Sequence, residues 1–510
     1  MSTTESSGAS GIVQAPSEPL PAPPGPHHER RWLTLGVILI AQMMLLLDAT
    51  IVNVALPSIQ GDLGFSDASR GWVVTAYLLA FGSLLLLGGR LADAFGRKNM
   101  FITGLIGFAV SSAVAGAAPN IETLITTRAV QGAFAAVMAP AALSLITVIF
   151  TDPKELSKAF AIFGAVAGSS SALGLMLGGL LTDYADWRWT MYVNIAFAIV
   201  GILGGLALLR HSSDTDKPKL SVPSTILGSA GVFGLVFGAA KAETDGWDAG
   251  ITLTSLIVGA VLLIGFVALQ KVDANPLVPL RVVTNRNRGA GLVTLLLGQA
   301  GVFALFLFLT YYFQGVLGYS PIKTGAAFLP MMLTVVVVAT LTQSVLTQHL
   351  SMRAIVTGGL IVSGAGAALL TRADASSHYA AWVLPGLILA GVGIGSAIVS
   401  AVALAQLGVD PQDAGAAGAV NNVAQQLGAA LGIAVISTFV ATATGDYLAD
   451  HGSTAAVDAT VHGFSVGFWW AAGAFWAGAV IAGALIHGGA RLHDEAGQPE
   501  PLDEIVGGII

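Results

Sequence analysis

Two ionisable residues lie deep inside long apolar segments of the sequence, Asp48 and Arg128. A charged side chain at the centre of a membrane helix costs roughly 2.5–3.5 kcal/mol on insertion scales, so such residues are usually functional. At 1.5 Å per residue, Asp48 lies about 13 Å before the C-terminal end of its segment, and Arg128 lies about 10 Å after the N-terminal end of its own. Both ends are expected on the outer side of the membrane. The similar depths predict that the two side chains can form a pair.

A carboxylate whose surroundings alternate can carry a proton. A neighbouring arginine favours the charged form of a carboxyl group, whereas an apolar cavity favours the neutral form. A movement that separates Asp48 from Arg128 would therefore make Asp48 bind a proton, and the reverse movement would release it. The alternative is a fixed salt bridge that only holds two helices together.

Amide side chains form two further polar faces. Gln131 lies three residues after Arg128, so the two share one helix face. Asn421, Asn422 and Gln425 form a polar stripe in a later apolar segment. Amides that face lipid would lack hydrogen bonds, so both groups are expected to face a cavity or another helix. We predict that all four amides line a substrate cavity; hydrogen bonding between helices is the alternative.

Closely spaced glycines precede residue 180. Gly164 and Gly168, and then Gly174 and Gly178, form two GxxxG steps, and Gly179 follows directly. Glycine allows a neighbouring helix to approach closely in a membrane. The spacing therefore predicts close helix packing along this segment.

The elements that carry these residues are predicted to be membrane-spanning helices. Of the 510 residues, 55% are hydrophobic and 10% are charged, and the net charge is −7. Soluble proteins carry about 25% charged residues. The composition excludes a soluble enzyme and a nucleic-acid-binding protein, and the absence of cysteine excludes disulfides and thiolate chemistry. We expect no metal site.

Fourteen apolar segments are long enough to cross a bilayer, which takes about 20 residues. Sixteen of the 22 Lys and Arg residues fall on the side of the N-terminus and five on the other side. This asymmetry predicts that both termini are cytoplasmic. The segments lie at 33–57, 71–92, 100–118, 121–149, 156–182, 189–209, 222–241, 251–270, 288–314, 321–347, 352–371, 381–406, 412–443 and 465–489.

An internal repeat divides the chain into two halves. Residues 164–178 and 418–432 match at seven of fifteen positions, and residues 91–106 resemble 346–361 more weakly. Parallel repeats of this kind are typical of transporters that bind substrate between their halves. The predicted parts are a disordered cytoplasmic tail at 1–30, a six-helix bundle at 31–210, a linker with two helices at 211–271, a second six-helix bundle at 272–489 and a cytoplasmic tail at 490–510.

Four motifs resemble the major facilitator superfamily, and within it the fourteen-helix drug:proton antiporter branch. LDATIVNVALP at 47–57 is similar to the first-helix signature of that branch, and GRLADAFGRK at 89–98 is similar to the superfamily's signature loop. RAVQG at 128–132 is similar to the arginine motif of the fourth helix. LGLMLGGLLTDYADWRWTMYVN at 173–194 is similar to the antiporter motif and the WRW…N that follows it, although Leu175 stands where proline is common.

The resemblance implies an all-α major facilitator fold and a role of Asp48 and Arg128 in proton coupling. It implies a bacterial plasma-membrane protein that exports hydrophobic or amphipathic small molecules, such as drugs or antibiotics, in exchange for protons. It also implies a cytoplasmic gating loop that helps to hold the outward-open state, formed by Gly89, Asp93, Gly96, Arg97 and Lys98. The basic pair at 97–98 also follows from topology alone.

Two other functions are possible for such a sequence. An exporter of a lipid or cell-envelope precursor would use a similar cavity. An intramembrane enzyme is disfavoured, because the sequence GFSVG at 463–467 opens a membrane helix rather than a strand–turn–helix. We therefore predict a monomeric transporter, not an enzyme, that is driven by protons without a cofactor and contacts membrane lipids.

Overall fold

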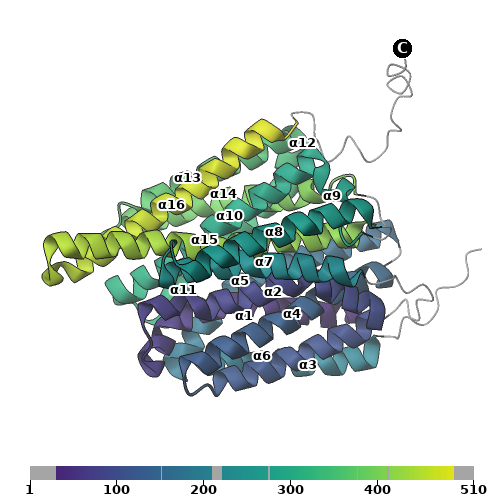
Figure 1. The fold of residues 1–510 in the computed structure, drawn as a ribbon, viewed down its shortest axis with the longest axis horizontal. Helices are drawn as coiled ribbons and strands as arrows, with labels where there is room; N and C mark the ends of the chain where they lie inside the picture. Colours follow the sequence, from purple (N-terminus) through teal and green to yellow (C-terminus); the bar gives the residue numbers. More distant parts are fainter. Residues whose placement is uncertain are drawn as a thin grey trace, which may run out of the picture.

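A computed structural model of the chain consists of long α-helices that lie side by side (Figure 1). It describes residues 30–150, 152–209, 221–273, 276–375, 377–409 and 413–487. Thirteen helices within these ranges are long and apolar enough to cross a membrane. The tails predicted at 1–30 and 490–510 lie outside the described residues, except for Arg30.

The long helices follow the order of the predicted segments. They are α1 Arg31–Leu63, α2 Asp67–Phe95, α3 Arg97–Gly116, α4 Ile121–Ile149, α5 Pro153–Tyr184, α6 Trp189–Leu208, α7 Val222–Asp245, α8 Gly250–Val272, α10 Arg286–Tyr311, α11 Pro321–Leu341, α13 Met352–Leu370, α14 Leu384–Gln406, α15 Ala414–His451 and α16 Ala456–Leu485. Short elements between them are α9 Leu280–Thr284, η1 Tyr312–Val316, η2 Thr342–Leu346, α12 Thr347–His349, η3 Tyr379–Val383 and η4 Ser453–Ala455. Of the long helices, α5 is the one that is not among the thirteen candidate spans.

Successive helices run in opposite directions, so their termini gather at two ends of the molecule. We name these the Gly64 end, where α1 is followed by α2, and the Gly96 end, where α2 is followed by α3. Both turns use a glycine in the left-handed region, with φ of 66° at Gly64 and 93° at Gly96. The Gly96 end lies on the right in Figure 1.

The same packing arrangement occurs in α1–α6 and again in α10–α16. In the first set, α1 packs against α5 and α6, α4 packs against α2 and α3, and α3 packs against α6. In the second set, α10 packs against α15 and α16, α14 packs against α11 and α13, and α13 packs against α16. The match pairs α3 with α13 and α5 with α15, as the sequence repeat does.

Two helix pairs make most of the contact between the first set and the second. One seam is the contact of α2 with α15, and the other is the contact of α5 with α11. The inserted helix α7 packs against both α2 and α15, and α8 packs on α7. The inserted pair therefore covers the α2–α15 seam (Figure 1).

The last two helices extend beyond the predicted segments. The sequence predicts apolar spans at 412–443 and 465–489, whereas α15 continues to His451 and α16 already begins at Ala456. Figure 1 shows this hairpin projecting past the other helices at the Gly64 end. Acidic residues such as Asp446 end the apolar pattern there, but they do not end the helix, so hydropathy alone placed these boundaries wrongly.

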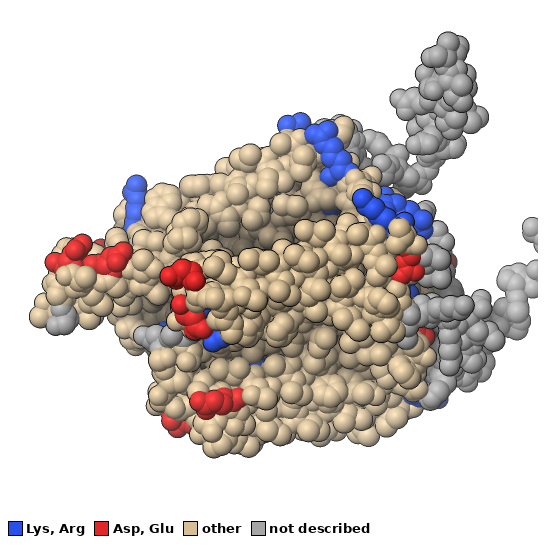
Figure 2. Space-filling view, in the orientation of Figure 1, with Lys and Arg blue, Asp and Glu red and all other residues tan. Residues whose placement is uncertain are grey.

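Charged side chains separate toward the two ends of the molecule. On the face drawn in Figure 2, acidic residues gather mainly at the Gly64 end and basic residues mainly at the Gly96 end. The band between the two ends is almost free of charge on this face. Such a band is what the hydrocarbon core of a bilayer requires of a protein surface.

Close packing of α2 on α4 requires glycine at position 88. A Cβ atom at Gly88 would lie 1.9 Å from the carbonyl oxygen of Ala136, so any side chain must force the two helices apart. We expect Gly88→Ala to destabilise the protein by about 1–3 kcal/mol, measured as a lower melting temperature in detergent. Gly36→Ala is the matched control, because a Cβ there meets nothing within 4 Å. Equal melting temperatures for the two variants would contradict this account of the packing.

Candidate functional site

Asp48 and Arg128 form a salt bridge inside the first set of helices. The Nη1 nitrogen of Arg128 donates to Oδ2 of Asp48 at 2.6 Å. The side chain of Arg128 is 1% exposed and that of Asp48 is 0% exposed. The partners come from the middle of α1 and of α4. The structure therefore brings together the two residues whose depths predicted a pair. A buried ion pair of this kind is costly to break, because the loss of either residue leaves an uncompensated charge in the interior.

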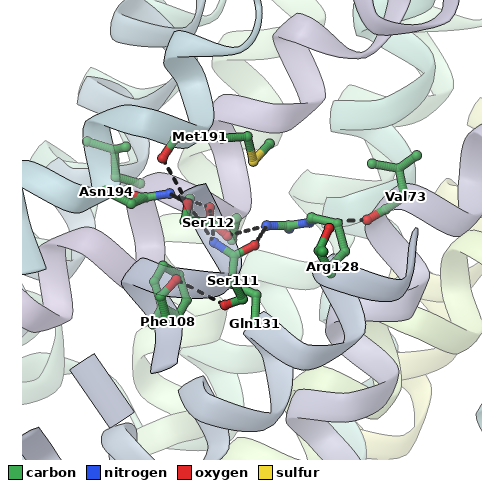
Figure 3. Close-up of polar contacts among 12 residues, drawn as sticks. Val73, Phe108, Ser111, Ser112, Arg128, Gln131, Met191 and Asn194 are labelled. Atoms are coloured by element: carbon green, nitrogen blue, oxygen red, sulfur yellow. Dashed lines mark hydrogen bonds and ion pairs between the residues drawn. The ribbon is translucent and has the colours of Figure 1, made fainter. Parts of the chain in front are cut away.

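Neutral side chains complete the hydrogen bonding of the Asp48 carboxylate (Figure 3). Nε2 of Gln131 and Nδ2 of Asn194 donate to Oδ1 of Asp48 at 3.0 and 2.7 Å. The Oγ of Ser112 accepts from both amides, at 3.3 and 3.0 Å, and donates to the carbonyl oxygen of Met191 at 2.8 Å. We name this group the buried polar network; it consists of Asp48, Arg128, Gln131, Asn194 and Ser112.

Arg128 has three partners besides Asp48. Its Nη1 donates to Oε1 of Gln131 at 2.6 Å, and its Nε donates to the carbonyl oxygen of Val73 at 3.3 Å. The ring of Tyr77 lies 4.5 Å from the guanidinium carbon. Gly132 allows this approach of α2, because a Cβ there would lie 2.3 Å from the carbonyl oxygen of Tyr77. The guanidinium is thus surrounded by neutral acceptors as well as by a carboxylate.

Three residues of this site were not predicted from the sequence, namely Ser112, Asn194 and Tyr77. Asn194 closes the WRW…N motif, so a signal for it was present in the sequence. Ser112 and Tyr77 lie on α3 and α2 with no distinctive spacing, and only the folded arrangement shows their role. Gln131 is placed with Asp48, and not with the amides of α15 that were expected to share a cavity with it.

Two glycines of α5, Gly174 and Gly178, lie against the stretch of α1 that follows Asp48. A Cβ at Gly174 would lie 2.0 Å from Oγ1 of Thr50, and a Cβ at Gly178 would lie 2.8 Å from the carbonyl oxygen of Ile51. Both positions therefore need glycine for the observed contact. A movement of α1 near Asp48 must also displace α5.

The next glycine of α5 faces the second set of helices. A Cβ at Gly179 would lie 2.5 Å from the carbonyl oxygen of Pro321, at the start of α11. Leu175 is fully buried in the same seam, with its carbonyl oxygen 2.4 Å from where a Cβ of Gly325 would lie. Gly164 and Gly168 belong to α5, but their surroundings lie outside the described part of the chain.

The predicted gating loop lies at the Gly96 end. Nζ of Lys98 donates to the carbonyl oxygen of Leu206 at 3.3 Å and also to that of Leu209, so the loop is held by the end of α6. A Cβ at Gly89 would make only an ordinary contact of 3.7 Å with Pro140. The five predicted residues lie in the last two turns of α2 (Gly89, Asp93), in the turn (Gly96) and at the start of α3 (Arg97, Lys98).

The amides of α15 interact with α10 and with their own helix. Nε2 of Gln299 on α10 donates to Oε1 of Gln425 at 3.1 Å. Nδ2 of Asn422 donates to the carbonyl oxygen of Gly418 at 3.2 Å. Asn421 is 3% exposed, and its Oδ1 is buried without a hydrogen-bond partner. Gln299 was not predicted, because a single amide in an apolar segment has no pattern to reveal it.

Hydrogen bonds between the two sets occur at the Gly64 end. Nε2 of Gln314 in η1 donates to the carbonyl oxygen of Val54 in α1 at 2.8 Å. The backbone nitrogen of Ile322 in α11 donates to Oδ2 of Asp183 in α5 at 2.9 Å. Toward the Gly96 end, a Cβ at Gly418 of α15 would meet nothing within 4 Å, although Leu86 of α2 shares an apolar cluster with Val420 and Val423 of α15. The two sets are therefore in close contact at the Gly64 end.

A double-mutant cycle tests whether the buried ion pair is an energetic unit. Arg128→Gln leaves the Asp48 carboxylate buried without a cation, and breaking a buried pair in this way costs about 3–5 kcal/mol. Adding Asp48→Asn removes both charges, so we expect the double variant to melt at a higher temperature than Arg128→Gln alone. Thermal unfolding in detergent measures this difference. Strictly additive losses would mean that the two charges do not interact.

Comparison with known proteins agrees with this architecture. The model of the Major Facilitator Superfamily matches residues 38–433. The chain is 48% identical to the puromycin resistance protein pur8 of Streptomyces alboniger, over 87% of this chain and 89% of that protein. It is 36% identical to the probable actinorhodin transporter of Streptomyces coelicolor, over 86% of this chain and 79% of that protein.

A solved structure shows the same fold at low sequence identity. A bacterial homologue of the human lysosomal transporter Spinster matches with a TM-score of 0.61 and 15% identity, over 90% of this chain and 96% of that chain. Together with the apolar helices, the bacterial relatives confirm a multi-pass protein of the bacterial plasma membrane. The family also shows a transporter rather than an enzyme. The chain belongs to the Major Facilitator Superfamily of transporters.

Proposed function

We propose that this transporter exports antibiotic-like small molecules in exchange for protons, and that Asp48 carries the proton. The observation that carries the proposal is the buried polar network, in which a fully enclosed carboxylate lies between one arginine and neutral amides. The relatives named for puromycin resistance and for actinorhodin transport support the substrate class. One proton that crosses 100 mV supplies about 2.3 kcal/mol, which sustains a roughly fortyfold substrate gradient.

The two helix sets would act as halves that rock against each other, with the inserted pair α7–α8 as the linker. Their matching internal packing supports this division, and so does the restriction of their mutual contacts chiefly to two seams. Counting α5 as a span, because it lies between α1 and α11, makes fourteen. An even number returns the chain to its starting side, and the basic Gly96 end would then be cytoplasmic by the positive-inside rule.

In this orientation the structure corresponds to a state that is closed toward the outside. The bonds of Gln314 with Val54 and of Ile322 with Asp183 would form the external closure. In this state Lys98 of the gating loop is bonded to α6 of its own half. In the outward-open state the same loop would hold the second half, with Asp93 as its acidic partner.

Protonation of Asp48 would weaken its ion pair without leaving Arg128 alone. Gln131 and the carbonyl oxygen of Val73 would keep their hydrogen bonds with the guanidinium, and the Tyr77 ring would keep its cation–π contact. These partners lower the cost of a buried cation that has lost its counterion. The change at Asp48 would then pass along α1 to the glycines of α5, and from α5 to α11.

The amides of α10 and α15 are our proposed substrate site in the second half. They include the buried, unpaired Oδ1 of Asn421, which needs a donor, and the linked pair of Gln299 and Gln425. These side chains are neutral, so they would recognise a substrate by hydrogen bonding, which suits a neutral or anionic molecule as well as a cation. The full proposed set is Gln299, Asn421, Asn422 and Gln425.

Asp48→Asn tests the proton-carrier role. We expect this variant to lose proton-driven efflux in proteoliposomes, because an amide cannot bind and release the proton, while its melting temperature shows that it still folds. Asp62→Asn is the matched control on the same helix, since Asp62 is partly exposed near the end of α1 and pairs with Arg188 at 2.8 Å. Unaltered proton coupling in Asp48→Asn would refute the role.

Asp93→Asn tests the gating loop. We expect it to slow transport without weakening substrate binding, because the loop would change the balance between two states and is not part of the proposed substrate site. Transport assays in proteoliposomes and equilibrium binding in detergent separate the two effects. A parallel loss of transport and binding would point to misfolding instead of gating.

A further inference from the structure

The side-chain oxygen of Asn194 is an unpaired acceptor beside Asp48. Oδ1 of Asn194 is buried without a hydrogen-bond partner, and the residue is 0% exposed. Its Nδ2, in contrast, donates both to Asp48 and to Ser112 (Figure 3). Buried acceptors are costly to leave unpaired, so native proteins rarely keep them without a reason.

The two protonation states of Asp48 need different neighbours. The charged carboxylate accepts from Arg128 at Oδ2, and from Gln131 and Asn194 at Oδ1. The neutral carboxyl group contains an O–H donor, which needs an acceptor. Because Oδ2 faces the guanidinium at 2.6 Å, the proton is better placed on Oδ1. Both neighbours of Oδ1 present N–H groups, so one amide must turn over.

Asn194 is the amide that can turn without losing a bond at its oxygen. Oε1 of Gln131 already accepts from Arg128 at 2.6 Å, so turning Gln131 would break a bond to a charged donor. Oδ1 of Asn194 has no such bond to lose. Ser112 would keep its bond from Gln131 and its own bond to Met191.

We infer that Asn194 is a positioning residue that lets Asp48 hold a proton, by turning its amide so that Oδ1 accepts from the neutral carboxyl group. The inference rests on the proposed role of Asp48 as proton carrier. Asn194 itself neither gains nor loses a proton. Its contribution is to pair with both forms of the carboxyl group, as a donor to the charged form and as an acceptor for the neutral form.

The charge around Asp48 comes from α4 and its titratable neighbour from α2. Arg128 faces the carboxylate, and Tyr77 lies across the guanidinium. The side chains of α3 and α6 in the buried polar network, Ser112 and Asn194, are neutral. Helices α5, α10 and α11 also pack on α1, and their charged residues lie near their ends. Replacing Asn194 therefore changes the hydrogen bonding of Asp48 without changing any charge.

Asn194→Leu removes an acceptor for the neutral form as well as a donor to the charged form. Its effect on the neutral form appears in the carbonyl stretching frequency of the protonated carboxyl group, which depends on whether the O–H of that group donates a hydrogen bond. Infrared difference spectroscopy of the full-length protein in detergent measures this frequency. The band is assigned by its absence from Asp48→Asn, and its frequency should be higher in Asn194→Leu, because the neutral carboxyl group has lost its acceptor.

Thr190→Val is the matched control on α6. Thr190 is 0% exposed and donates to the carbonyl oxygen of Trp187, one turn away from Asn194. Its band frequency should equal that of the wild type, and Asn194→Gln, which keeps an amide, should shift less than Asn194→Leu. If Asn194→Leu does not fold, Asn194→Ala removes the amide with a smaller side chain and should shift in the same direction.

The outcomes separate this inference from the proposal on which it rests. A wild-type band that disappears in Asp48→Asn, with an unchanged frequency in folded Asn194→Leu or Asn194→Ala, overturns the role of Asn194 and leaves Asp48 as the carrier. If no titrating band depends on Asp48, the carrier role and the inference both fail. A shift in Thr190→Val equal to that in Asn194→Leu would also overturn the inference, because it would show a general effect of altering α6.

Discussion

The buried ion pair of Asp48 and Arg128 determines how the first helix set must pack. Two opposite charges with almost no exposure are tolerated in an apolar interior only when each has several partners. Helices α2 and α6 supply such partners through Val73 and Asn194. Ser112 of α3 accepts from the two amides that donate to Asp48. Five helices therefore meet at one point because a single carboxylate and a single guanidinium need them there.

Close glycine contacts connect this point to the rest of the molecule. Glycines of α5 lie against the turn of α1 that follows Asp48, and the next glycine of α5 lies against α11 of the second set. Packing without side chains at these positions leaves little freedom for one helix to move alone. A movement of α1 caused by a change of charge at Asp48 would thus pass through α5 to the α5–α11 seam between the two sets.

The sequence predicted most of the fold but only part of the site. The long apolar segments predicted the spans, and matching residues at 164–178 and 418–432 predicted the internal repeat. The similar depths of Asp48 and Arg128 predicted their pairing. Ser112 could not be assigned from the sequence, and Asn194 could be assigned to a motif but not to Asp48, because the partners of both depend on which helices become neighbours. Gln131 was grouped with the amides of α15 for the same reason: helical periodicity places a residue on a face, but it does not tell which helix that face meets. The ends of α15 and α16 were misplaced because polar residues continue both helices beyond the apolar pattern.

We propose that one buried carboxylate couples transport to protons. Among the described residues, the acidic residues other than Asp48 lie near helix ends or in the turns between helices. The most direct measurement is the proton-to-substrate ratio, obtained in proteoliposomes from the pH gradient at which a known substrate gradient is exactly balanced and net transport stops. The account predicts one proton per substrate molecule. A ratio of two or more would contradict it, because it would require a second proton carrier.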